Sequence, residues 1–236
     1  TGNKIFISGA GETEVLVVMA RTGEPGAKGI SAFVVDADIA GISFGRAEDE
    51  MGWNAQPTRM VNFDQVGAAA ANLLGKEGDD FTIAMKGLDG GRVNIATVGL
   101  GTAQQALSEA LAFVNDRKQF GKPIAAFQGI QFKLADMNTE LVAARQMVRL
   151  AAFKLDNKYP DATTYCAMAK RFATDISYQV CDEALQCFGG SGYIKEYPME
   201  RYLRDSRVHR ILEGTNEIMR VIIARRILLK DSQAIL

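Results

Sequence analysis

The sequence has one histidine and three cysteines among 236 residues, and both shortages exclude whole classes of site. A single histidine, His209, rules out a metal site built from several histidines, and nothing resembles a zinc cluster of cysteines. The cysteines lie in a stretch that reads as helix and lack CxxC spacing: Cys166, Cys181 and Cys187. We therefore expect buried or free thiols in a reducing compartment rather than a disulfide framework.

An excess of one charge and a long apolar run are also missing. The 27 Lys and Arg residues nearly balance the 28 Asp and Glu residues, so nothing marks the chain as a binder of nucleic acid or of a membrane surface. No apolar run is long enough to span a bilayer. The composition is that of an ordinary globular protein, and the length suits one large core or two modest ones.

Residues 1–66 read as β structure. The chain begins at Thr1 without an initiator methionine and enters a strand almost at once, so we expect a fragment whose N-terminal part is absent. Short runs rich in β-branched and aromatic residues recur between glycine-containing turns. The predicted strands are 5–8, 15–20, 30–35 and 60–63. Their spacing predicts a small antiparallel, barrel-like β domain over residues 1–70.

From about residue 75 the pattern becomes helical. One helix has an apolar stripe at steps of three and four residues, formed by Leu134, Met137, Leu141, Ala144, Val148, Ala151 and Leu155. A turn at 159–161 ends it, a further helix runs to the glycines after Phe188, and a last helix begins near Ile218. An earlier helix is predicted from the spacing of Phe81, Met85, Leu88, Arg92 and Ile95, and the glycines at 87, 90 and 91 within it are expected to weaken it. We predict an antiparallel four-helix bundle over 71–236, and an α+β fold for the chain.

Arg117-Lys118-Gln119-Phe120-Gly121 lies at the break between two long helices. Two interpretations stay open. In one, the segment is a helix C-terminus, where cations complement the helix dipole and Gly121 is the residue after the cap. In the other, the guanidinium of Arg117 binds a phosphate, Phe120 packs on a flat ring, and Gln128 adds a hydrogen bond from the next helix.

A second candidate is Gln186-Cys187-Phe188-Gly189-Gly190-Ser191-Gly192. A helix that ends in glycine explains one of these glycines. Two adjacent glycines and a third nearby exceed what a cap requires, and they suit a place where a ligand or another backbone comes close.

Glu213 is the candidate for catalysis in the segment Glu213-Gly214-Thr215-Asn216-Glu217. A helix start, with Thr215 or Asn216 as its N-cap, accounts for Glu217 better than for Glu213. Glu213 follows two apolar residues and precedes the helix, and a carboxylate in apolar surroundings can act as a base near neutral pH. In Asp89-Gly90-Gly91-Arg92, a solvated helix face is the default interpretation, although the two glycines also open a groove.

Taken in order, these segments resemble the acyl-CoA dehydrogenase family. The match also includes Arg204-Asp205-Ser206-Arg207, and it covers essentially the whole chain. The resemblance implies the family's middle β domain and its C-terminal four-helix bundle, with the N-terminal helical domain absent. It further implies FAD between the two domains, with the adenine end of FAD reaching a neighbouring subunit.

The resemblance also assigns residues. Glu213 matches the catalytic base, and Asp89, Gly90, Gly91, Arg92 and Gly214 match the acyl-CoA contacts. Matches to FAD contacts, some of them to the FAD of a partner subunit, are Phe6, Ile7, Ser8, Arg117, Phe120, Gln128, Gln186, Cys187, Phe188, Gly189, Gly190, Thr215, Asn216 and Glu217. No metal is implied. Some family members carry the base at the position that matches Gly91, which has no side chain here, and this favours Glu213.

The implied reaction is α,β-dehydrogenation of a short branched acyl-CoA. Segments 87–96 and 204–213 look most like family members that convert isobutyryl-CoA to methacrylyl-CoA in valine breakdown. Alternatives are butyryl-CoA or 2-methylbutyryl-CoA as substrate, or a non-catalytic helical oligomerisation module of the same fold. The implied partners are identical subunits in a homotetramer and an electron-transfer flavoprotein as electron acceptor. The implied location is the bacterial cytoplasm or the mitochondrial matrix.

Overall fold

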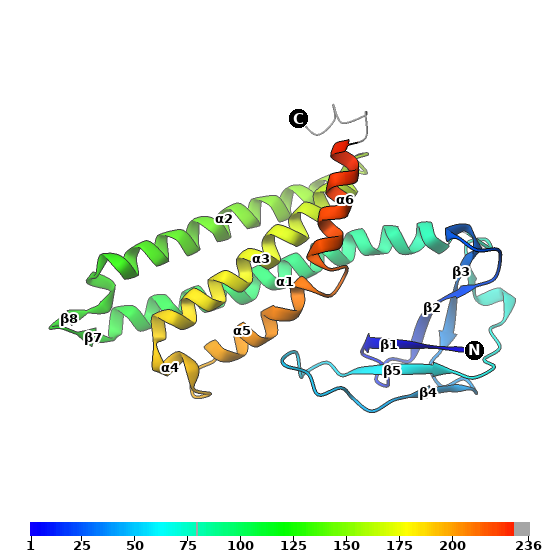
Figure 1. Cartoon of the computed structure of the whole chain (residues 1–236), viewed down its shortest axis with the longest axis horizontal. Coiled ribbons are helices and arrows are strands. Elements are labelled where there is room, and N and C mark those ends of the chain that lie inside the picture. The colour runs from blue at the N-terminus through cyan, green and yellow to red at the C-terminus, as the bar shows by residue number, and fades with distance from the viewer. Residues whose placement is uncertain (79, 229–236) are drawn as a thin grey trace. The chain divides into compact units, whose positions relative to one another are not determined.

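The computed structural model describes residues 1–78 and 80–228 (Figure 1). Residue 79 and residues 229–236, which belong to the predicted helical domain, lie outside the described residues. Contacts within the chain divide it into two compact units, the first being Thr1–Gly87 and the second beginning at Leu88. The two units are described separately below.

The first unit consists of two small antiparallel sheets. One has the strand order β1-β5-β4 and the other β2-β3-β6. The strands are β1 (Gly2–Ser8), β2 (Val15–Arg21), β3 (Ile30–Asp36), β4 (Ile42–Phe44), β5 (Thr58–Phe63) and β6 (Leu73–Leu74). The four predicted strands are confirmed. The short strands β4 and β6 were not predicted, because three and two residues are too few to show an alternating pattern.

Strand β1 is irregular where it carries predicted site residues. Its register with β5 shifts between Lys4 and Ile7, and Phe6 within this interval has a positive φ of 58°. A local insertion of this kind re-aims a side chain. The Phe6 ring is 68% exposed, whereas Ile7 packs on the small core of Ala10, Leu16, Ala37 and Val61.

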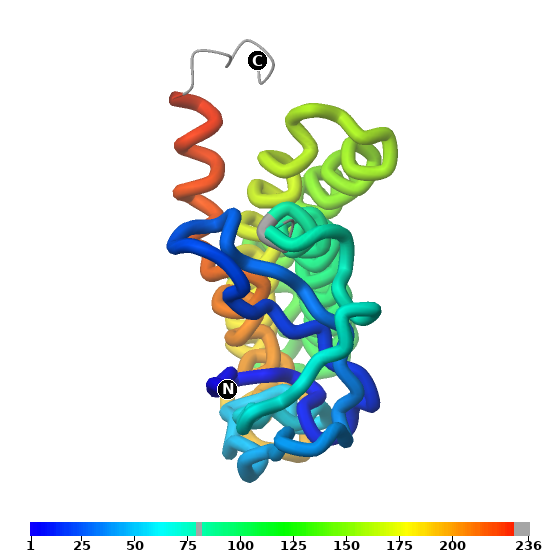
Figure 2. Tube along the Cα trace, turned by 90° about the vertical axis from the view of Figure 1, so that its right-hand side faces the viewer, coloured from blue at the N-terminus to red at the C-terminus, as the bar shows by residue number. Residues whose placement is uncertain are grey.

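The second unit is a bundle of helices. Helices α1, α2 and α3 run along one another and α5 completes their shared core (Figure 1). The helices are α1 (Asp80–Asp116), α2 (Gln128–Asp156), α3 (Ala162–Phe188), α4 (Gly190–Tyr193), α5 (Met199–Arg207) and α6 (Asn216–Leu228). The turn between α2 and α3 lies at the same end of the bundle as α6 (Figures 1 and 2). Among the described residues, no helix has the length and hydropathy to cross a membrane.

Small side chains line much of the bundle core. On α1, Ala96, Ala103 and Ala110 recur every seven residues, and each is fully buried. The predicted stripe of α2 is also confirmed, since Met137, Leu141, Ala144, Val148 and Ala151 are buried. Because the side chains at a contact set the distance between helix axes, alanines here allow the helices to approach closely.

Helix α1 continues through Gly87, Gly90 and Gly91 without a break. The expectation that these glycines weaken the helix does not show as an interruption, because tertiary packing outweighs intrinsic propensity in a bundle. Gly99, further along the helix, has a packing reason of its own. A Cβ there would come 3.1 Å from Oγ of Ser177 on α3.

The break after α1 is a β-hairpin, which corrects the helix-cap interpretation of Gly121. Helix α1 ends at Asp116, and the strands β7 (Lys118–Gln119) and β8 (Lys122–Pro123) follow. Gln119 pairs with Lys122, so Phe120 and Gly121 form the two-residue turn between them. Their φ angles of 51° and 79° are those of the turns that suit such hairpins. Gly121 therefore serves the hairpin rather than the end of the helix.

The core assignment can be tested on α2. We expect Leu141→Ala to lower the free energy of unfolding by about 2–5 kcal/mol, because the side chain is 1% exposed and its loss leaves a cavity. Leu150→Ala is the matched control, since the same residue type on the same helix is 43% exposed. Urea denaturation followed by circular dichroism measures both. A loss below about 1 kcal/mol for Leu141→Ala would contradict its place in the core.

Candidate active site

Glu213 lies on a tight turn between the short helix η4 (Val208–Arg210) and α6. Its φ is 55°, and that of Gly214 is 89°. A residue other than glycine in this left-handed region costs on the order of 1 kcal/mol and persists only where the surroundings enforce it. A side chain at Gly214 would be strained because of this positive φ, and its Cβ would also lie 2.8 Å from Cε of Met219.

The Glu213 carboxyl group lies directly against Gly91 of α1. A Cβ placed on Gly91 would be 2.8 Å from Cδ of Glu213, which is closer than real Cβ contacts come. Glycine at this position of α1 therefore makes the room that the carboxylate occupies. Two residues that the sequence singled out separately, 122 positions apart, thus meet at one point.

Lys170 of α3 lies beneath this turn with its side chain fully buried. Its Nζ donates to the carbonyl oxygen of Gly214 at 2.8 Å and to Oδ1 of Asn216 at 2.9 Å. Burial lowers the pKa of Lys170 to about 8, although the nearby carboxylates of Asp175 and Glu213 oppose this shift. Sequence reasoning missed Lys170. The burial of Ser177, one heptad further along α3, places Lys170 on the same inward face, but that burial is visible only in the structure.

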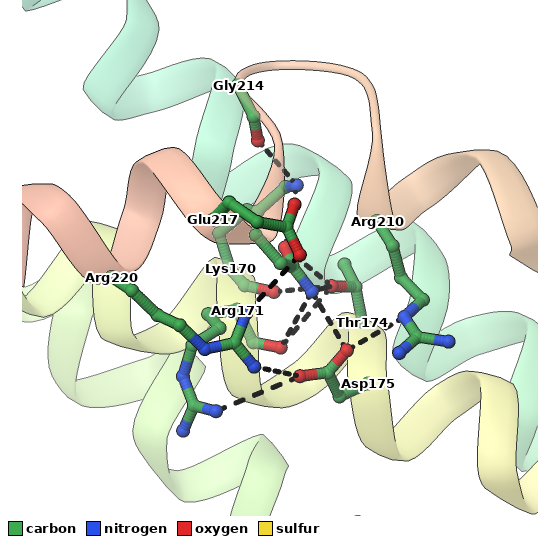
Figure 3. Close-up of polar contacts among 9 residues, drawn as sticks. Lys170, Arg171, Thr174, Asp175, Arg210, Gly214, Glu217 and Arg220 are labelled. Carbon is green, nitrogen blue, oxygen red and sulfur yellow. Dashed lines mark hydrogen bonds and ion pairs between the residues drawn. The ribbon is translucent and has the colours of Figure 1, made fainter.

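Asn216 and Asp175 extend this polar cluster across three elements. The amide nitrogen of Asn216 donates to Oγ1 of Thr174 at 3.0 Å and to Oδ1 of Asp175 at 2.9 Å. Asp175 in turn faces guanidinium groups from α3, η4 and α6, as Figure 3 shows. These belong to Arg171, Arg210 and Arg220, at 3.8, 2.8 and 3.6 Å.

The start of α6 agrees with the predicted helix cap. Oγ1 of Thr215 accepts from the backbone N–H of Ile218 at 3.4 Å, so Thr215 is the N-cap residue. Glu217 lies in the first turn with its side chain 81% exposed. Asn216, which the resemblance matched to a cofactor contact, turns its side chain into the bundle instead.

Asp89 and Arg92 form a buried ion pair one helical turn apart on α1. Nη1 of Arg92 lies 2.8 Å from Oδ1 of Asp89, and Oγ1 of Thr163 donates to the other carboxylate oxygen at 2.6 Å. Both residues are less than a tenth exposed. They were predicted to contact acyl-CoA. In the chain as described, they bind one another and Thr163 of α3. The prediction that this segment forms a solvent-exposed helix face is therefore wrong for Asp89 and Arg92.

The predicted residues of the hairpin, of the start of α2 and of the end of α3 lie at the opposite end of the bundle (Figure 1). The Phe120 ring is 90% exposed, and Arg117 and Gln128 are also exposed. Cys187 and Phe188 point inward, and the Phe188 ring stacks on Phe113 at 4.1 Å. The side chains of these two residues are therefore turned away from the surface.

Gln186, Gly189 and Gly190 at this end are exposed. A Cβ on Gly189 or Gly190 would meet no atom within 4 Å. Gly189 has a φ of 57°, so the glycine suits the backbone conformation at the helix end as well as an open surface.

The two groups of predicted residues are far apart along the helix. Arg92 and Arg117 are separated by nearly the whole remaining length of α1, roughly 35 Å at about 1.5 Å of rise per residue. The structure thus brings Glu213, Gly214, Gly91, Asp89 and Arg92 into one neighbourhood and keeps the hairpin residues away from it. Among the described residues, no group of three or more His, Cys, Asp or Glu side chains is arranged to hold a metal ion.

Comparisons with known proteins agree on the family. The middle domain of acyl-CoA dehydrogenase matches residues 1–66, and the C-terminal domain of the same family matches residues 78–228. The mitochondrial isobutyryl-CoA dehydrogenase of Dictyostelium discoideum is 54% identical over 96% of this chain and 55% of its own length. The corresponding protein of Bos taurus is 51% identical with the same coverage.

Among solved structures, butyryl-CoA dehydrogenase from Megasphaera elsdenii superposes with a TM-score of 0.94 at 42% identity. That match covers 96% of this chain and 59% of the other. The chain therefore spans little more than half the length of the relatives it matches. With both domain models matched in order over nearly all of its residues, the chain belongs to the acyl-CoA dehydrogenase family.

Proposed function

We propose that the protein is a flavin-dependent dehydrogenase that oxidises isobutyryl-CoA to methacrylyl-CoA. The observation that carries this proposal is the Glu213 carboxylate, presented by a left-handed turn against a glycine of α1 and close to a buried lysine. A carboxylate fixed in this way is suited to the removal of a proton from carbon.

Oxidation of a saturated thioester requires the loss of a proton from Cα and of a hydride from Cβ. Glu213 takes the Cα proton as its carboxylate becomes a carboxylic acid. Bound FAD would supply the acceptor for the hydride that leaves Cβ. The remaining task of this chain is to hold the carboxylate at a fixed place and to keep it there during the reaction.

The contact between Glu213 and Gly91 supports Glu213 as the base. By resemblance, some family members carry the base at the position of Gly91. A side chain at Gly91 would enter the space that the Glu213 carboxyl group fills. Both positions therefore direct a carboxylate to the same point, and this chain uses the one on the turn.

Several residues fit a flavin dinucleotide. Exposed aromatic rings at Phe6 and Phe120 offer flat apolar surfaces to a ring system, and the exposed Arg117 offers a guanidinium to phosphate. The open backbone at Gly189 and Gly190 allows close approach. The site of this group is thus consistent with the side chains that the chain presents.

The separation of the two residue groups supports a homotetramer arranged as a dimer of dimers. Residues near Glu213 serve the reaction centre, and the hairpin residues at the other end of the bundle serve the dinucleotide of a neighbouring copy. Closed symmetry is the usual way to satisfy two such surfaces on one chain. We further propose an electron-transfer flavoprotein as electron acceptor, in the bacterial cytoplasm or the mitochondrial matrix.

The acyl chain can be tested with a panel of substrates. Both curated relatives described above carry the name isobutyryl-CoA dehydrogenase, whereas the solved structure is of a butyryl-CoA dehydrogenase. We expect kcat/KM for isobutyryl-CoA to exceed that for its straight-chain isomer butyryl-CoA, and that for 2-methylbutyryl-CoA, which is one methylene longer, by roughly tenfold or more. An equal or higher value for butyryl-CoA would reassign the substrate.

For the base, we expect Glu213→Gln to slow flavin bleaching by isobutyryl-CoA by roughly 10²–10⁴-fold. The amide keeps the size of the side chain and cannot accept the proton. The measurement is anaerobic stopped-flow absorbance on the complete gene product. Binding of FAD and of acyl-CoA should be retained and is measured on the same preparation.

Glu217→Gln is the comparison variant, because Glu217 is the other acid on this loop. It should bleach much faster than Glu213→Gln. If Glu213→Gln bleaches at a rate near that of wild type, another residue is the base. If only Glu217→Gln bleaches slowly, Glu217 is the base.

For the cofactor, we expect Arg117→Ala to weaken FAD retention more than it slows flavin reduction. A guanidinium bound to phosphate contributes charge-assisted hydrogen bonds worth about 1.5–3 kcal/mol, or roughly 10–100-fold in dissociation constant. Equilibrium dialysis of FAD measures the change. Lys118→Ala, which removes a positive charge from the same hairpin, is the control. An equal loss of FAD affinity in the two variants would mean that Arg117 contributes only its positive charge and makes no specific bond to phosphate.

A further inference from the structure

The turn that carries Glu213 has little backbone hydrogen bonding of its own. The N–H groups of Ile211 and Leu212 both donate to the carbonyl of Val208, and the next regular bond begins only at Thr215. Across the described residues, the hydrogen bond from Lys170 to the Gly214 carbonyl is the one that ties the backbone of Glu213 and Gly214 to a helix. A strained conformation needs such a support to persist.

We propose that Lys170 is a positioning residue, which holds the Glu213–Gly214 turn through the Gly214 carbonyl and so keeps the Glu213 carboxylate against Gly91. The catalytic consequence of this inference rests on the function proposed above. Lys170 does not itself contact the reacting atoms, because its ammonium is fully buried and bonded to the turn and to Asn216.

The support is rigid because Lys170 is held on both sides. Its second acceptor, Oδ1 of Asn216, belongs to a side chain that also donates to Thr174 and Asp175 of α3. Ion pairs then fix the chain on either side of the turn. Arg210 before it and Arg220 after it both reach Asp175 (Figure 3).

The position of the carboxylate has little tolerance. The carboxyl group lies against Gly91, so a shift of the turn would move it away from this contact. Misplacement of a reacting group by about 1 Å costs on the order of 10²-fold in rate. Loss of the Lys170 bond should therefore affect the chemical step more than it affects acyl-CoA binding.

The test compares Lys170→Met with wild type in the FAD-saturated, complete gene product. Methionine keeps much of the side-chain volume and cannot donate a hydrogen bond. We expect amides of residues 211–217 to exchange with deuterium about tenfold faster or more, measured by mass spectrometry. The rate of flavin reduction by isobutyryl-CoA should fall by roughly 10–100-fold, with a change in KM below about threefold.

Lys154→Met is the matched control. Lys154 is also a lysine of the bundle with little exposure and pairs with Asp161 at 2.6 Å; within the described part of the chain, this ion pair lies apart from the turn. The Lys154→Met variant should have a lower thermal stability than wild type. Its amide exchange at residues 211–217 and its rate of flavin reduction should be unchanged. This comparison separates support of the turn from a general loss of stability.

Unchanged exchange at 211–217 in Lys170→Met would overturn the proposal. If Lys170→Met does not fold, Lys170→Gln is measured instead. Its side chain is about one bond shorter than that of lysine, so its amide falls short of the position from which the ammonium donates to the Gly214 carbonyl. Failure of both variants to fold would assign Lys170 to folding of the bundle and would also overturn the proposal. If wild type is not bleached by any acyl-CoA, the proposed function fails, while the exchange experiment still decides the role of Lys170.

Discussion

The burial of one ammonium group organises this end of the molecule. Lys170 has no access to solvent, and a buried charge destabilises a protein unless its donors find acceptors. The carbonyl of Gly214 and the side chain of Asn216 meet that requirement. Because both belong to the segment between η4 and α6, satisfying the lysine also fixes the course of the chain around Glu213.

Helix α3 connects this polar cluster to the rest of the core. Its inward face is polar near the turn, with Lys170, Thr174 and Ser177 all fully buried. About two turns further along the helix, this face becomes apolar. It packs into the bundle through Val180 and Ala184. One helix therefore contributes apolar side chains to the bundle core along its length, and its first half also supports a strained turn.

The two ends of the bundle have different physical requirements. Near Glu213 the side chains are buried, paired and closely fitted, as a fixed carboxylate requires. At the hairpin, Arg117 and Phe120 stand exposed on a short turn, and the glycines after Phe188 leave the backbone open. A surface of the second kind suits a molecule that arrives from outside the bundle. Its distance from Glu213 along α1 supports a division of labour between copies of the chain.

The sequence by itself determined the α+β class, the longer strands and the helices of the bundle, because hydrophobic periodicity and turn residues are local signals. It also identified Glu213 and Gly91 as residues of interest, from a glycine-rich stretch and from a glutamate outside its helix. The tertiary structure decided that these two residues meet and that Asp89 and Arg92 turn toward each other. It also decided that Phe188 points inward and that Lys170 supports the turn. The physical reason is that burial and hydrogen-bond pairing depend on contacts between segments far apart in the chain, which no local pattern encodes.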